Sequence, residues 1–260
     1  MAVAFVQGVQ AQFGSVTFGA ATAGNMLVLM VNQTSTTATP TATGWTQLSA
    51  TSAVYSTSTS SIFYLYKIAA GGETSITPVA GSGGTLNGLL FWEISGLGAL
   101  PTVDTIQPAS NLSSTGNNTT AITTTKSTDI VLVGTGAVNG MASMTWDAAL
   151  TGVSTVGITA GAYSIPGTTL SAKSYTNTLG SARAHANLVV AISPTPVVNV
   201  AIAQVAANLT LTGGTQTVAS IRNVAIAQVA ANLTLTGGTQ TVVGIVIITE
   251  AYELTMLGIG

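Results

Sequence analysis

Charge is the scarcest property of this chain. Five basic and seven acidic residues make up only 5% of its 260 positions, where an average soluble protein has roughly 25%. The basic residues are scattered, and nucleic-acid binding requires clustered Lys or Arg to neutralise phosphates. We therefore exclude nucleic acid as a direct partner, and a polybasic segment for a membrane surface on the same ground.

Cysteine is absent, which excludes disulfide bonds and thiolate metal sites. The single histidine, His185, has no second ligand at metal-binding spacing, and no Asp-x-Asp calcium loop occurs, so we expect no metal or other cofactor. The longest aliphatic run, Val242 to Ile248, is far shorter than the roughly 20 residues that cross a bilayer, so no membrane insertion is expected. The first residues lack the basic region and apolar core of a signal peptide; a leader removed before residue 1 is the alternative.

No residue pattern indicates catalysis. The acids are dispersed, and Glu93, within the apolar segment LLFWEISG, is better explained as a sheet residue bonded to backbone than as one of a catalytic pair. A serine nucleophile would need a base, and no G-x-S-x-G motif occurs. Alternation puts Arg183, His185 and Asn187 on one strand face, which we expect to be solvated or part of an interface. We therefore predict no enzymatic activity and no catalytic residues.

The composition favours strands, because Thr, Val and Ile are plentiful and helix-favouring Glu, Lys and Arg are rare. Short apolar or alternating segments recur with turn residues between them, and the continuous run Asn25 to Val31 suits a strand buried on both faces. This pattern predicts an antiparallel Greek-key or jelly-roll β-sandwich over residues 1–193. The polar stretch Ser110 to Ser127 is interpreted as a long crossing between its two sheets.

Two parts of the sandwich region are loosely alike. The run Asn25 to Val31 followed by Gly44 to Leu48 resembles Asp129 to Val138 followed by Met144 to Leu150. Either pseudo-symmetry of the sandwich or the general similarity of two hairpins explains this.

A Pro-containing linker is predicted at 194–198, because two prolines one residue apart cannot continue a central strand. Beyond it the twenty residues 199–218 recur unchanged at 223–242, a period of 24. Each copy is too short to bury its own apolar face, so residues 199–260, including the apolar C-terminal strands, are predicted to form a β-repeat assembly region. Its hairpin turns are placed at two glycine pairs, namely Gly213 with Gly214 and Gly237 with Gly238. In a hairpin with its turn at Gly213 and Gly214, the strand Leu209–Thr212 pairs with the strand Thr215–Val218.

The three tryptophans lie within or beside strand patterns, so core packing is the favoured reading for each. Trp45 and Trp146 are the candidates for contact with a glycan, since an exposed indole stacks on sugar rings.

The first 190 residues resemble a β-sandwich module common in tailed-bacteriophage virion proteins and bacterial surface proteins. The resemblance rests on AGNMLVL from Ala23, YLYK from Tyr64, AAGGETSIT from Ala69, WEISGL from Trp92 and TDIVLV from Thr128. The segment IAQVAANLTLTGGTQTV is similar to repeats at the C-termini of phage minor tail and other virion proteins. The resemblance implies a virion location and a non-enzymatic role, and it leaves open capsid decoration, head fibre or minor tail component.

These observations together predict a virion structural protein, assembled in the cytoplasm of a bacterial host. Its repeats would mediate self-association or docking on capsid or tail proteins. With few charges to protect its strand edges, the chain is expected to form a homo-oligomer, and the resemblance favours a trimer over a dimer. The alternative is a glycan-binding adhesin or receptor-binding module on the virion or cell surface, recognising a host glycan.

Overall fold

The computed structural model describes residues 2–55, 59–98, 101–114, 118–141, 143–154, 157–180 and 183–195, and six short strands between residues 209 and 246. Contacts divide the chain into two compact units, Met1–Thr195 and Pro196–Gly260, which are described separately. The division falls inside the segment 194–198 that the sequence marks as a linker. The described residues form strands and no helix, which confirms the prediction of an all-β fold built on an antiparallel sandwich.

The first half of unit one forms a central antiparallel sheet with strand order β1-β8-β3-β6-β4, and β5 also pairs with β6. A second, two-stranded sheet of β2 and β7 belongs to the same half; we call it the first outer sheet. The strands are β1 (Ala4–Ala11), β2 (Val16–Thr17), β3 (Met26–Thr34), β4 (Thr46–Gln47), β5 (Ala53–Tyr55), β6 (Ser60–Ile68), β7 (Ser75–Ile76) and β8 (Thr85–Ser95).

The second half repeats this plan. Its central sheet has the order β9-β16-β11-β14-β13, and its outer sheet the order β10-β15-β12. The strands are β9 (Thr102–Ser114), β10 (Asn118–Ile122), β11 (Ile130–Met141), β12 (Met144–Trp146), β13 (Thr151–Ser154), β14 (Gly157–Ser164), β15 (Lys173–Leu179) and β16 (Arg183–Ser193). The interpretation of Ser110 to Ser127 as a long crossing is corrected. The chain does pass here from the central sheet to the outer sheet, but β9 continues to Ser114 and β10 begins at Asn118, because Thr-rich segments suit strands as well as loops.

Apart from β5 and β12, the two halves correspond strand by strand. Leu27 of β3 lies opposite Lys67 of β6, and Val131 of β11 lies opposite Ser164 of β14. Each half also has a tight turn directly before an edge strand of its central sheet, β4 in the first half and β13 in the second. Trp45 N–H donates to Ala42 C=O at 3.0 Å, and Leu150 N–H donates to Asp147 C=O at 2.9 Å. Of the two explanations for the internal likeness, the structure therefore supports pseudo-symmetry.

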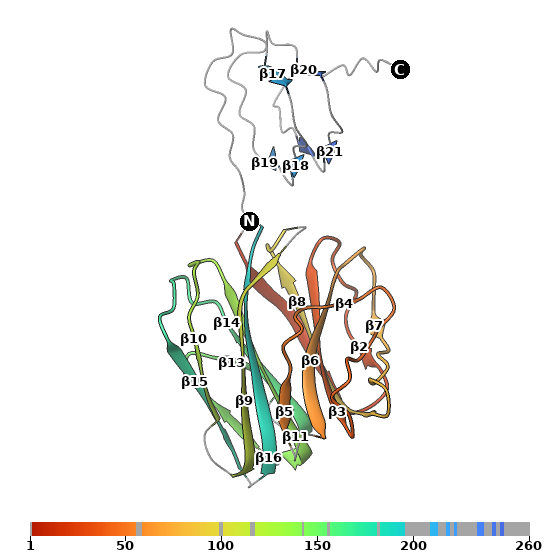
Figure 1. The fold of residues 1–260 in the computed structure, drawn as a ribbon, viewed down its shortest axis with the longest axis vertical. Helices are drawn as coiled ribbons and strands as arrows, with labels where there is room; N and C mark the ends of the chain where they lie inside the picture. The colour runs from red at the N-terminus through yellow and green to blue at the C-terminus, as the bar shows by residue number, and fades with distance from the viewer. Residues whose placement is uncertain are drawn as a thin grey trace. The chain divides into compact units, whose positions relative to one another are not determined.

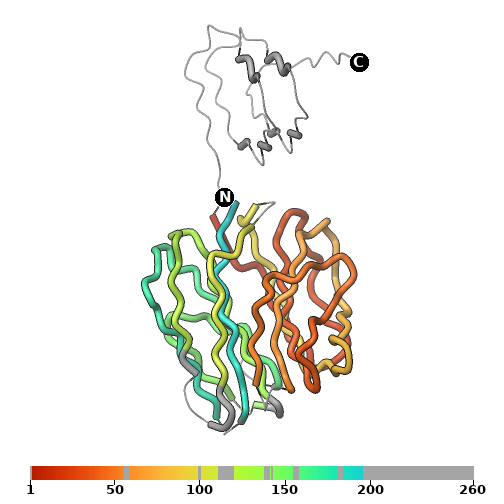
Figure 2. Tube along the Cα trace, in the orientation of Figure 1, coloured from red at the N-terminus to blue at the C-terminus, as the bar shows by residue number. Residues whose placement is uncertain are grey.

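The main hydrophobic core lies between the two central sheets. In Figure 1 the red-to-yellow strands of the first half stand beside the green-to-cyan strands of the second, and Figure 2 shows the same division along the chain. The inner faces contribute alternate residues, among them Met26, Val28 and Trp92 from the first sheet and Ile130 and Leu132 from the second. Burial of this apolar surface is the main force that holds the halves together.

The outer faces of both central sheets are also buried. Leu27, Leu29 and Val31 pack against the first outer sheet, and Val131 and Val133 pack against the second. This four-layer arrangement explains why β3 is buried along nearly its whole length, as its continuous apolar run predicts.

The polar face of β16 is covered rather than solvated. His185 and Asn187 are buried. The Asn177 side chain of β15 donates from Nδ2 to Asn187 Oδ1 at 2.7 Å and to Thr135 Oγ1 at 2.6 Å. The expectation of a solvated or interface face is therefore wrong for His185 and Asn187, because the second outer sheet covers this face and Asn177 supplies hydrogen bonds that water would otherwise provide.

The described strands of unit two pair in parallel and in register. They are β17 (Leu209–Thr212) with β20 (Leu233–Thr236), β18 (Thr217–Val218) with β21 (Thr241–Val242), and β19 (Ile221–Arg222) with β22 (Ile245–Val246). Within these strands each residue lies opposite the residue 24 positions later. This corrects the predicted hairpin pairing of Leu209–Thr212 with Thr215–Val218. Identical segments stack like on like when the copies lie side by side, and the hairpin pattern read within one copy could not reveal that. The two glycine pairs lie outside the described residues.

Candidate functional site: the Trp45 pocket

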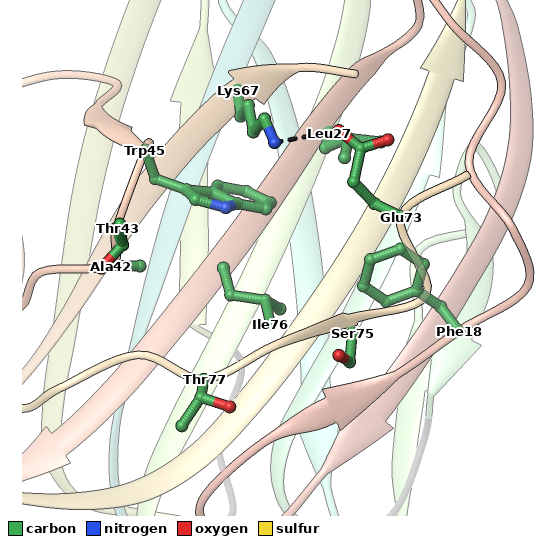
Figure 3. A pocket seen from close by; sticks show the side chains of 10 residues that line it. All are labelled: Phe18, Leu27, Ala42, Thr43, Trp45, Lys67, Glu73, Ser75, Ile76 and Thr77. Carbon is green, nitrogen blue, oxygen red and sulfur yellow. Dashed lines mark ion pairs between the residues drawn. The ribbon is translucent and has the colours of Figure 1, made fainter. Parts of the chain in front are cut away.

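A pocket of about 300 Å³ lies between the outer face of the first central sheet and the first outer sheet. Its apolar lining consists of Phe18, Leu27, Ala42, Trp45 and Ile76, and hydroxyl and charged groups complete it, namely Thr43, Lys67, Glu73, Ser75 and Thr77. Figure 3 shows the Trp45 ring extending into the space between Lys67 and Ile76. Polar groups make up at least as much of this lining as apolar ones, whereas small-molecule sites typically have a mostly apolar wall.

Local structure fixes the apolar wall. Trp45 closes the turn from Ala42 and directly precedes Thr46, which pairs with Tyr66 of the central sheet. On the opposite side, Phe18 stacks on buried Phe91 with ring centroids 3.8 Å apart and planes 9° apart. The indole therefore lies half-buried at the mouth, with a rigid aromatic pair across from it.

An ion pair forms the polar part of the pocket. Lys67 Nζ lies 2.9 Å from Glu73 Oε1. Two backbone amides also bind the carboxylate: Ala70 N–H donates to Oε1 and Gly71 N–H to Oε2, each at 2.8 Å. The hydrogen bond from Lys67, followed by that from Ala70, lowers the pKa of Glu73 to about 2. Glu73 is therefore ionised and fixed in position at any ordinary pH.

The second half holds a side chain at the corresponding place. Tyr175 of β15 is buried against the outer face of its central sheet, as Ile76 of β7 is against the first. The Tyr175 hydroxyl is hydrogen-bonded to Ser164, which occupies the strand position that Lys67 has in the first half. Leu150 stands where the first half has Trp45. In the second half the Tyr175 phenol ring thus spans from the outer sheet to the central sheet, whereas in the first half the shorter Ile76 side chain occupies the corresponding strand position.

The structure separates the two tryptophans proposed as glycan contacts. Trp45 lines the pocket. Trp146 packs beside two hydrophobic clusters of the second half, and its Nε1–H donates to Ser154 C=O at 3.3 Å. Trp92 is fully buried between the central sheets, as core packing predicts. Sequence reasoning did not single out Lys67 or Glu73, because their proximity depends on how the segment after β6 turns back toward the sheet.

The acids of the described part of the chain all have structural partners. Glu93, fully buried, accepts hydrogen bonds from Thr22 N–H at 2.9 Å, Asn25 Nδ2 at 2.6 Å and Gln7 Nε2 at 2.5 Å. The preferred reading of Glu93 as a backbone-bonded sheet residue is thus confirmed, with two side-chain amides added. Asp147 accepts from Ala149 N–H at 2.8 Å.

The carboxyl groups of Asp104 and Asp129 lie close enough to affect each other's pKa. Asp129 is fully buried and accepts a hydrogen bond from Ser193 Oγ at 2.6 Å, and burial raises its pKa. Partial burial acts in the same direction on Asp104, but hydrogen bonds from the Thr125 hydroxyl and amide outweigh it and lower the pKa of Asp104. Asp129 is therefore the carboxyl that retains its proton to higher pH.

Within the described residues no group of three or more His, Asp or Glu side chains could hold a metal ion, and no helix there is long and apolar enough to cross a membrane. Comparison of the chain with protein-family models, curated proteins and solved structures finds no match.

Proposed function

We propose that this chain is a non-enzymatic structural protein of a tailed-phage virion, as capsid decoration, head fibre or minor tail component, and that its C-terminal repeats mediate assembly. The resemblance of its motifs to virion modules suggests the location. The observation that carries the assembly role is the in-register parallel pairing of the two repeats.

That pairing gives the repeats a surface for addition of further copies. Among the described strands, β17 and β20 each have one partner, so one edge of each remains available for pairing. A repeat from a second chain can continue the same parallel stack, since it offers the same sequence in the same register. Stacks of this kind usually need three or more repeats for stability, and a homo-oligomer supplies them.

The partners of the carboxylates support a non-enzymatic role. In the described region the acids are occupied by amides, hydroxyls or lysines that fix strand ends and turns, which is a structural use of charge. These acids are Glu73, Glu93, Asp104, Asp129 and Asp147.

Native mass spectrometry of the full chain tests the assembly role. We expect a homo-oligomer, with a trimer favoured. Thr210→Pro removes a backbone donor from β17 and should reduce the oligomer to monomer, while Thr210→Val keeps that donor and should not. A wild-type chain that is a monodisperse monomer of 25.8 kDa would overturn this role. For the location, an antibody to the purified protein should label intact particles; labelling confined to other fractions would overturn it.

A second candidate function is glycan binding on a virion or cell surface, as an adhesin or receptor-binding module. The observation that favours it is that Trp45 lines a pocket with a fixed carboxylate and an ammonium group.

A further inference from the structure

We propose that Asp104 and Asp129 form a pH-sensitive latch, in which Asp129 as a carboxylic acid donates a hydrogen bond to the Asp104 carboxylate and thereby holds the end of β16 in place. Asp104 belongs to β9, and Asp129 directly precedes β11. The arrangement has a counterpart in the first half, where a side-chain amide is the donor. The inference goes beyond the assembly role and does not depend on it.

Strand register shows which residues correspond in the two halves. Met26 of β3 and Ile130 of β11 each lie opposite the next-to-last residue of the neighbouring strand, an isoleucine in both halves. Asn25 and Asp129, the residues directly before them, therefore occupy the same place. The edge strand beside each of these neighbours also carries one extra residue at the same point of the register, Val6 in β1 and Asp104 in β9. A β-bulge of this kind redirects a side chain.

In the first half an amide closes this end of the sheet. Asn25 donates from Nδ2 to Glu93 Oε1 at 2.6 Å, and Thr22 N–H donates to the same oxygen at 2.9 Å. The carboxylate thus ties the segment before β3 to the neighbouring strand β8. A side-chain amide is a donor at every pH, so Asn25 needs no proton from solution.

In the second half a carboxyl group stands where the first half has Asn25. The Asp104 carboxylate accepts hydrogen bonds from Thr125 N–H and Thr125 Oγ1–H, each at 2.6 Å. The side chains of Asp104 and Asp129 are hydrogen-bonded to each other. Ionised carboxylates only accept hydrogen bonds, so one of the two must carry a proton.

Burial assigns that proton to Asp129. Its side chain is fully buried, and its Oδ1 accepts a hydrogen bond from Ser193 Oγ at 2.6 Å. In the described part of the chain no donor reaches Asp129 Oδ2. An ionised Oδ2 would be a buried charge without compensation, whereas a protonated Oδ2 is a donor for which Asp104 is the acceptor.

The latch should open as pH rises. Burial acts most strongly on Asp129 and raises its pKa, and the Asp104 charge adds to this; the Ser193 hydrogen bond and the charge of exposed Lys126 act in the opposite sense and are outweighed. Below the ordinary aspartate pKa of about 4 the latch is fully closed. As pH rises from there through the folded-state pKa, the proton passes to water and two carboxylates face each other. Opening should increase by up to about tenfold per pH unit in this window and level off above it.

The latch holds the point at which the chain leaves the sandwich. Ser193 is the last residue of β16 and pairs with Thr102 of β9. Two residues later Thr195 N–H donates to Leu97 C=O at 2.8 Å. The pH therefore regulates how firmly the residues before the 194–198 segment are anchored, and opening should speed amide exchange in residues 189–195 and 123–129.

Three substitutions test the latch. Asp129→Asn copies the first half, where Asn25 has the corresponding place, so this variant should fold and stay closed at every pH. Asp104→Asn removes the neighbouring negative charge and should move the transition to lower pH. Asp147→Asn is the matched control, because Asp147 lies in the same half and accepts a hydrogen bond from Ala149 N–H, outside the latch.

Two measurements on the full-length protein, from about pH 4 to pH 9, report the proton and the opening. Infrared difference spectroscopy detects the C=O stretch of a protonated carboxyl group. This band should persist in the wild type and in Asp147→Asn above the pH at which ordinary aspartates ionise, and it should be absent from Asp129→Asn. Hydrogen–deuterium exchange, corrected for its intrinsic pH dependence, should rise with pH in the wild type and in Asp147→Asn and stay flat in Asp129→Asn.

Three results would overturn the proposal: no protonated-carboxyl band that depends on Asp129, a flat exchange profile in the wild type, or a rise with pH that persists in Asp129→Asn. Circular dichroism confirms folding of each variant. If Asp129→Asn misfolds, Asp104→Asn decides the question, and a transition that stays at the wild-type pH would count against the latch.

Discussion

Addition of one methyl group at Gly161 should destabilise the sandwich strongly. A Cβ at this position would lie 1.9 Å from Leu90 Cδ2 and 2.6 Å from Trp92 Cζ2, whereas carbon atoms pack at about 3.5–4.0 Å. Leu90 and Trp92 are fully buried in the core between the central sheets, so neither can move into solvent. Overpacking of this kind costs about 1–3 kcal/mol. We expect the cost of Gly161→Ala to lie at the upper end of this range, because the buried Trp92 ring has no room to move aside.

A double-mutant cycle tests this reasoning. Leu90→Ala alone should cost about 2–5 kcal/mol through the cavity it leaves. In the double variant the new methyl group has room, so the combined cost should be lower than the sum by about 1–2 kcal/mol. Urea unfolding of the full-length chain, followed by near-UV circular dichroism, measures each free energy. Gly161→Ala alone should lower Tm by about 5–10 °C. Additive effects, or a Gly161→Ala protein as stable as the wild type, would refute the packing argument.

Three further predictions concern charge and the repeats. Glu93→Ala removes the acceptor of the buried Asn25 amide and of two part-buried donors, Gln7 Nε2 and Thr22 N–H, and should cost about 1–3 kcal/mol in urea unfolding. An unchanged free energy of unfolding would contradict this role. The raised pKa of Asp129 means that its contribution to stability is present at low pH and is lost as pH rises through the folded-state pKa. Asp129→Asn should therefore raise Tm more at pH 7 than at pH 4, and an equal gain at both pH values would show that Asp129 is not the protonated partner. Replacement of Gly213 and Gly214 by two valines should disrupt the oligomer without lowering the Tm of the sandwich, because β-branched residues resist the positive φ that a tight turn needs. Native mass spectrometry measures the oligomer, and an intact oligomer would count against turns at these glycines.

The facing surfaces of the two central sheets are complementary in side-chain size. Gly134 and Gly161 of the second central sheet stand opposite large side chains of the first, and a Cβ on Gly134 would lie 2.1 Å from Met30 Sδ. Large residues on one sheet thus pack into space left by glycines on the other. The halves share one topology but have complementary surfaces, which favours their packing against each other.

The sequence by itself determined the strand content, the buried character of β3, the division near residue 195 and the existence of the repeats. Each of these follows from local information. Alternation and turn residues specify strands, a continuous apolar run specifies burial on both faces, and an exact period specifies repeated units.

Only the tertiary structure decided what covers each face and which segments pair. Alternation placed His185 and Asn187 on a polar face, but the covering strand β15 became evident only in three dimensions. The repeat sequence suits a hairpin within a copy or a parallel stack between copies, and the observed register selects the stack. Trp45 and Trp146 have similar sequence surroundings, yet only Trp45 lines the pocket. The physical reason is common to all three: side-chain periodicity reports the direction in which a residue points, and long-range packing alone determines what it meets there.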